Sequence, residues 1–189
     1  MGQAGQTGQS LIEPSTLSNS EEIRTVGALR DPAVWIGTAG GFGYAPIAPG
    51  TFGSFAAVLL FLAAVWADLG FATYVVAVGV VSGVGIWASD RCEKAFGKKD
   101  DGRIVIDEVA GQLITLAPVF FVGPGLTRTG IAWVVTGFVL FRVLDIWKPG
   151  PVRWAERRFQ GGLGVMADDL LAGAIGAVLL ATALWVLSA

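Results

Sequence analysis

Five long runs without a charged residue dominate this chain of 189 residues. A helix needs about 20 mainly apolar residues to cross the hydrocarbon core of a bilayer. Only 15% of the residues are charged, whereas globular domains carry about a quarter. The sequence therefore predicts an all-α integral membrane bundle of about five membrane-embedded helices, with short or re-entrant segments possible. The runs cover residues 32–67, 69–89, 109–127, 129–141 and 170–189.

The helices predicted from these runs do not all have the same length. The run at 129–141 is short by itself, so the fourth helix has to continue through Arg142 and Asp145. A charge at the centre of a bilayer costs at least about 2.5–3.5 kcal/mol. We therefore expect these two residues near the interface or facing the bundle interior. The predicted helices cover about residues 51–67, 71–89, 109–122, 131–147 and 170–187.

Small residues at a spacing of four recur in these predicted helices. Gly79 and Gly83 form a GxxxG pair, and Gly53 with Ala57 and Ala172 with Gly176 form looser versions. Such spacings favour close packing of one membrane helix on another.

The first thirty residues differ from the rest of the chain. They are rich in Gly, Gln and Ser and lack the apolar core of a secretory signal. We expect a disordered tail at 1–30 and one membrane-embedded domain at 31–189.

Basic residues predict which loops face the cytoplasm. Lys and Arg gather before residue 31, between the second and third predicted helices, and between the fourth and fifth. Cytoplasmic loops are enriched in these residues close to the ends of membrane helices. The carboxylate-rich loops then all face the cytoplasm. We expect membrane lipid as a partner, and no nucleic acid.

The absence of histidine and the presence of a single cysteine exclude several kinds of site. His-dependent lipid phosphatases, Ser-His-Asp hydrolases and metalloproteases all require histidine. Cys92 by itself cannot form a multi-thiolate zinc site. A site for a metal would have to be built from oxygen ligands.

Two acidic pairs are placed at the starts of the third and fifth predicted helices. Asp107 and Glu108 precede one apolar run, and Asp168 and Asp169 precede the other. Both helices are expected to run in the same direction, and each carries the sequence Asp-x-x-Ala-Gly. The carboxylates could converge on one hard cation, for which Mg²⁺ is the usual choice beside phosphate. The alternative is that acidic residues suit helix N-termini by about 0.3–1 kcal/mol each.

Two further polar clusters have both a functional and a structural interpretation. Thr51 and Ser54 open the first predicted helix, where free N–H groups and hydroxyls bind an anion or only cap the helix. Asp145 lies one turn after Arg142 and forms either an intrahelical ion pair or part of a catalytic site.

Taken together, four motifs resemble those of the phosphatidylglycerophosphatase A family of bacterial membrane lipid phosphatases. In chain order they are G-Y-x-P-x-A-P-G-T-x-G-S, D-D-G-x-I-V-x-D-E, F-R-x-x-D-x-W-K-P-x-P-x-R-W and G-G-x-G-x-M-x-D-D-x-x-A-G. The resemblance covers about residues 33–188. Lys99 and Glu156 depart from it, since some relatives carry His at the first of these places and relatives often carry Asp at the second.

The resemblance implies Mg²⁺-dependent hydrolysis of phosphatidylglycerophosphate to phosphatidylglycerol and inorganic phosphate, at the cytoplasmic face of the bacterial inner membrane. Asp107, Glu108, Asp168 and Asp169 are then expected to bind Mg²⁺. Lys148, Arg153 and Arg142 are expected to hold phosphate oxygens, with attraction of lipid headgroups as the plainer alternative for the basic stretch. Asp145 and Asp101 are the candidates for nucleophile or base.

Two other functions stay open. A phosphotransferase acting on another lipid headgroup would also be rich in carboxylates, but its D-G-x-x-A-R signature is missing. A cation transporter would carry charges at mid-span, whereas these carboxylates cluster at the helix ends.

Overall fold

The computed structural model describes residues 31–123 and 125–188, and within them the chain forms helices and no strand. The all-α fold predicted from the sequence is confirmed. The predicted tail at 1–30 lies outside the described residues. In chain order the elements are α2 (Pro32–Gly37), the 3-10 turn η1 (Phe42–Tyr44), α3 (Pro49–Trp66), α4 (Phe71–Phe96), α5 (Ile106–Val122), α6 (Arg128–Trp147), α7 (Gly150–Arg158) and α8 (Gly161–Ser188).

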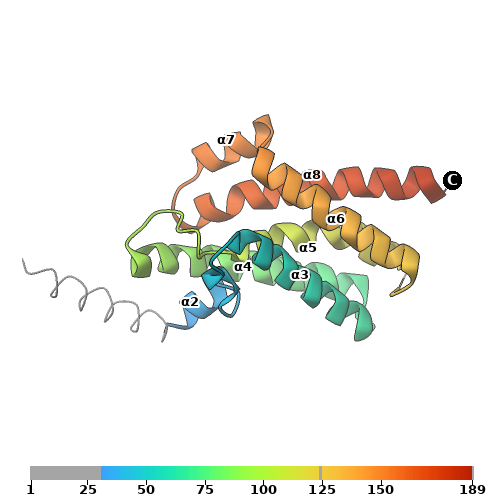
Figure 1. The fold of residues 1–189 in the computed structure, drawn as a ribbon, viewed down its shortest axis with the longest axis horizontal. Helices are drawn as coiled ribbons and strands as arrows, with labels where there is room; N and C mark the ends of the chain where they lie inside the picture. The colour runs from blue at the N-terminus through green and yellow to red at the C-terminus, as the bar shows by residue number, and fades with distance from the viewer. Residues whose placement is uncertain (1–30, 124, 189) are drawn as a thin grey trace, which may run out of the picture.

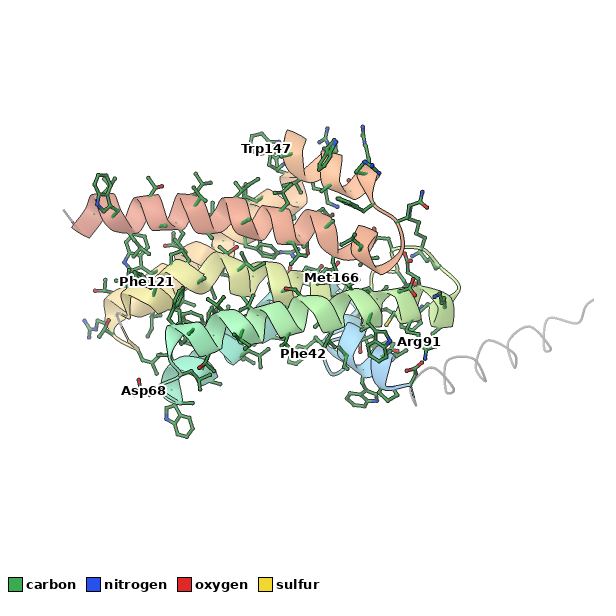
Figure 2. All side chains as sticks on the ribbon, turned by 180° about the vertical axis from the view of Figure 1, so that it is seen from behind. Phe42, Asp68, Arg91, Phe121, Trp147 and Met166 are labelled. Carbon is green, nitrogen blue, oxygen red and sulfur yellow. The ribbon has the colours of Figure 1, made fainter. Side chains whose placement is uncertain are left out.

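Four of these helices, α3, α4, α6 and α8, are long and apolar enough to cross a membrane. Helices α4 and α8 run along the long axis of the molecule, α3 and α6 run obliquely to it, and α2 and α7 lie toward one end (Figure 1). Figure 2 shows Asp68 and Phe121 at one end of the bundle and Arg91 at the other. The loop after α3 and the end of α5 therefore lie opposite the basic end of α4, as the charge pattern predicts. This arrangement fits a multi-pass membrane protein.

Helix α5 is the inner helix of the bundle and packs against α3, α4, α6 and α8. It has 17 residues and at about 1.5 Å per residue is shorter than a bilayer core of about 30 Å. Its neighbours shield it, and it contains the buried polar residues Gln112 and Thr115. The Thr115 hydroxyl donates to the Gly111 carbonyl at 3.0 Å. A short, partly polar helix is tolerated here because protein surrounds it.

Helices α5 and α8 cross in close contact. A Cβ atom on Gly111 would lie 2.5 Å from the Asp169 carbonyl oxygen, and a Cβ on Gly173 would meet the Gly111 backbone. Glycine is required at both places because no other residue lets two helix backbones approach so closely. The repeated Asp-x-x-Ala-Gly segments therefore pack on each other.

Helix α8 starts earlier than predicted, at Gly161. Asp168 and Asp169 are therefore about two turns inside the helix, and the expectation that they begin it is wrong. The reason is packing: a Cβ on Gly162 would collide with the Ile86 carbonyl of α4, so the glycine-rich stretch lies directly on α4. Attraction to a helix N-terminus does not explain these two aspartates.

The expected packing at the GxxxG pair of α4 is also wrong. In the part of the chain that the structure describes, Cβ atoms on Gly79 and Gly83 would meet nothing within 4 Å, whereas one on Gly53 would collide with Val105 and one on Gly176 with Thr115. The spacing shows where a helix could approach, but the positions of the other helices decide whether one does.

Helix α2 supports the connection between α4 and α5. The Val105 amide donates to the Gly37 carbonyl at 2.9 Å, and a Cβ on Gly43 would collide with the Arg103 carbonyl. The segment before α5 is thereby held against α2 and η1, which sets where α5 begins.

We expect Gly111→Ala and Gly173→Ala to destabilise the protein by about 1–3 kcal/mol each, the usual range for overpacking a tight contact. Gly79→Ala and Gly83→Ala are matched controls, since both add a methyl group to open space in a helix and are expected to change stability by at most about 1 kcal/mol, in the stabilising direction. Thermal unfolding in detergent tests this, and equal losses in all four variants would contradict the α5–α8 crossing.

Candidate active site

A cavity of about 610 Å³ lies between the start of α3, the connection before α5, and parts of α5, α6, α7 and α8. Glu156 of α7 contributes to its lining, and Figure 1 shows α7 at one end of the bundle. Seven carboxylates and three basic side chains line it. The cavity is therefore strongly acidic. Its charged lining residues are Lys99, Asp100, Asp107, Glu108, Arg142, Asp145, Lys148, Glu156, Asp168 and Asp169.

Three of these carboxylates form a compact cluster. Asp107, Glu108 and Asp169 each offer one oxygen, and these oxygens all lie within 4.8 Å of one another. Asp107 and Asp169 each precede by one turn the glycine at which α5 and α8 cross. The close crossing therefore brings the two aspartates together from helices distant in the sequence.

The cluster fits a hard cation. Asp107 Oδ1 and Glu108 Oε2 are buried and have no hydrogen-bond partner among the described residues. Buried ionised carboxylates without partners are costly unless they are paired or coordinate a metal. Mg²⁺ takes oxygen ligands, usually one or two carboxylates together with waters and phosphate oxygens. The side chains present are thus suited to hold such an ion.

Asp168 lies in the same cavity but makes a different contact. Its Oδ2 atom is 2.6 Å from Lys148 Nζ, which is also 2.9 Å from Glu156 Oε1. Lys148 ends α6 in a left-handed backbone conformation with φ 46°. Burial acts to lower the pKa of this amine, but the hydrogen bonds from Lys148 to Asp168 and Glu156 outweigh it, and the pKa is raised. Lys148 therefore stays a cation.

The remaining aspartate of α6, Asp145, also lines the cavity. Its Oδ2 atom lies 2.7 Å from Arg142 Nη1, so the intrahelical ion pair forms within the candidate site. Arg142 Nη1 also donates to Ser54 Oγ at 3.4 Å. Ser54 does not line the cavity, but it links α3 to the guanidinium behind the acidic cluster.

Besides Ser54, three other residues proposed from the sequence lie outside the cavity lining. Arg153 is exposed on α7, and the Thr51 amide donates to the Ala48 carbonyl in the first turn of α3. Asp101 is buried in an ion pair, with Oδ1 2.7 Å from Arg103 Nε. The hydrogen bond from Arg103, with smaller charge effects, lowers the pKa of Asp101 despite its burial.

The structure adds cavity residues that the sequence did not single out as functional. Lys99 and Glu156 both line the cavity although they depart from the family motifs, and Asp100 joins them. Among the described residues, Lys99 is the basic lining residue without a carboxylate partner. The high density of charged residues at 99–108 is the sequence feature that could have indicated Lys99 and Asp100 as cavity residues.

The cavity is rich in carboxylates and lies at one end of a helical bundle that can span a membrane. These features are typical of membrane-embedded proteins that act on charged groups at a bilayer surface. The chain matches the phosphatidylglycerophosphatase A family over residues 35–184. It belongs to this family, and is therefore a phosphatase, a hydrolase of phosphoric monoesters.

Individual relatives agree with the family assignment. Phosphatidylglycerophosphatase A of Escherichia coli is 39% identical over 140 residues, covering 74% of this chain and 76% of the relative. The protein of the same name from Haemophilus influenzae is 33% identical over 162 residues, covering 85% and 94%. A Bacteroides thetaiotaomicron protein provisionally named a phosphatidylinositol-3-phosphatase is 40% identical over 163 residues, covering 82% and 94%. No solved structure matches this chain.

We expect Asp101→Asn to lower phosphate release less than about tenfold, because it breaks the ion pair of a buried carboxylate with the partly exposed Arg103 and removes nothing from the cavity. The connection at 97–105 is expected to become more sensitive to limited proteolysis. A loss of activity as large as that of Asp145→Asn, with unchanged proteolysis, would instead assign Asp101 a direct chemical role.

Proposed function

We propose that this protein hydrolyses phosphatidylglycerophosphate to phosphatidylglycerol and inorganic phosphate with Mg²⁺ as cofactor. The cluster of Asp107, Glu108 and Asp169 beside Lys148 and Arg142 is the observation that supports this most directly. The names of the Escherichia coli and Haemophilus influenzae relatives supply the substrate.

Mg²⁺ bound by the three clustered carboxylates would neutralise phosphate oxygens and draw charge from the phosphorus–oxygen bond that breaks. Asp168 stays a predicted ligand, although its carboxylate contacts Lys148 in this structure. A cavity with seven carboxylates and three basic residues repels a phosphate unless a cation offsets this charge. The excess of carboxylates is thus itself an argument for the metal.

Cationic side chains then hold the phosphate. Lys148 and Arg142 are each already turned toward a carboxylate at the cavity wall, and Lys99 adds an amine without such a partner. Asp145 acts as the base that takes a proton from the attacking water, or as the nucleophile itself. In the net reaction one water molecule is consumed, the bond from phosphorus to the glycerol oxygen breaks, and that oxygen takes a proton.

The position of the cavity suits a lipid headgroup. Apolar side chains such as Leu60 and Val76 are exposed along the membrane helices, where acyl chains can contact them. Headgroup phosphates lie just outside the apolar layer, and the cavity is at the end of these helices. The basic residues gather at this same end, which by the positive-inside tendency faces the cytoplasm of a bacterial inner membrane.

Purified protein given phosphatidylglycerophosphate is expected to release phosphate with Mg²⁺ and to lose this activity after chelation. Asp169→Asn and Asp145→Asn are expected to lower the rate at least about 100-fold, as when a positioned acid–base group is lost. Asp90→Asn removes an exposed carboxylate on α4 that pairs with Lys94 and should keep the native rate. Phosphatidylinositol 3-phosphate is assayed as a second lipid, because one relative is named a phosphatidylinositol-3-phosphatase.

Unchanged release in both site variants would overturn the site. No release from the native protein with either lipid, together with cation flux in vesicles, would overturn the enzymatic proposal in favour of a transporter.

A second expectation concerns the two neighbouring lysines at 98 and 99. Lys99→Gln should raise KM about fivefold and leave kcat nearly unchanged, as expected for one exposed charge contact of about 1 kcal/mol. Lys98→Gln is the matched control, because Lys98 pairs weakly with Asp101 at 3.9 Å and does not line the cavity. Equal KM values for both variants would exclude Lys99 from substrate binding.

A further inference from the structure

Gln112 is the least satisfied side chain in the described part of the bundle. It is fully buried in α5, and neither its amide nitrogen nor its amide oxygen has a hydrogen-bond partner. An apolar residue of the same size would fill this place without loss, since an unpaired buried amide destabilises a fold. A polar side chain at such depth in a membrane-embedded helix therefore needs a functional explanation.

Gln112 lies directly below the acidic cluster. It is four residues after Glu108, which places it about 40° around the helix and about 6 Å deeper in the bundle. Side chains at this spacing are neighbours on a helix surface. The distance is within reach of two long side chains.

The contacts of α5 with α6 place Arg142 between the levels of Gln112 and Glu108. Leu116 would meet a Cβ on Gly137, and a Cβ on Gly111 would meet the ring of Phe141. The two helices run in opposite directions, so Gln112 is level with Leu140 and Phe141, and Arg142 lies one to two residues nearer the cavity. Arg142 in turn approaches Glu108, since a Cβ on Gly50 would contact both of these side chains.

The unpaired atoms around this level are complementary. Glu108 Oε2 is a buried acceptor without a donor, and Arg142 Nε is a buried donor without an acceptor. The Gln112 amide offers one N–H₂ donor and one oxygen acceptor. Few side chains other than an amide can supply both kinds of bond at one position.

We propose that Gln112 is a positioning residue that joins the Glu108 carboxylate to the Arg142 guanidinium in the Mg²⁺-loaded protein. The amide N–H₂ donates to Glu108, which keeps its other lone pairs for the cation, and the amide oxygen accepts from Arg142 Nε. This holds a metal-binding carboxylate and a phosphate-binding cation at a set spacing. The inference rests on the proposed metal site and deepens it.

The test exploits two effects of opposite sign. Replacing Gln112 by Met removes an unpaired amide, so without Mg²⁺ the melting temperature of the full chain in detergent should stay equal or rise. Loss of such an outer partner of a metal ligand typically weakens metal affinity 10- to 100-fold. The Mg²⁺ concentration that gives half of the Mg²⁺-induced rise in melting temperature should therefore increase about tenfold or more.

Activity gives the second measurement. In Gln112→Met, phosphate release should fall at the native half-saturating Mg²⁺ concentration and recover in excess Mg²⁺. Gln112→Asn keeps the amide but is one methylene shorter, and should shift the Mg²⁺ midpoint in the same direction if the Met variant does not fold. Ser89→Ala is the matched control, since it removes another buried unpaired polar atom, on α4, and should keep the native midpoint.

The outcomes separate the two proposals. A native protein that responds to Mg²⁺, with unchanged midpoints in Gln112→Met and Gln112→Asn, overturns the role of Gln112 and leaves the metal site standing. A native protein with no response to Mg²⁺ in either measurement overturns both. An equal shift in Ser89→Ala would also overturn the inference, because the effect would then be a general one of buried polar atoms.

Discussion

The close crossing of α5 and α8 at Gly111 and Gly173 is the contact on which the rest of the site depends. Each glycine follows a buried aspartate by one turn, so the approach of the two backbones also sets the approach of Asp107 and Asp169. Protein interiors are close-packed and do not absorb an added methyl group without displacement. Packing and chemistry are therefore coupled at this crossing, since a helix shift would alter the spacing of the carboxylates.

Charge balance explains the arrangement around this crossing. Arg142 contacts Asp145, and Lys148 contacts both Asp168 and Glu156. Among the described residues, the three clustered carboxylates have no salt bridge to a basic side chain, which is the electrostatic condition for holding a cation. In the proposed reaction, Arg142 and Lys148 are thus already held at the cavity wall before the phosphate binds, and such advance positioning is what phosphoryl transfer chiefly requires.

The helices of the bundle differ in whether they can face lipid or must be surrounded by protein. Helices α3, α4, α6 and α8 have the length and apolar composition to face lipid, whereas α5 is shielded by them and contains buried polar groups. Polar atoms are tolerable in such a helix only where other parts of the protein surround them. The inner position of α5 explains both its short length and its content of Asp107, Gln112 and Thr115.

The sequence alone determined the membrane class, the approximate helix positions and the acidic motifs, because apolar length and charge are local properties of the chain. It did not determine that α8 begins at Gly161, that Gly79 and Gly83 lack a packing partner, or that Asp101 turns to Arg103. Each of these depends on which surface another helix or loop presents. The pairing of Lys148 with Asp168, and the approach of Arg142 to Glu108, likewise came only from tertiary structure, because these residues meet across helices whose relative depth no local pattern encodes.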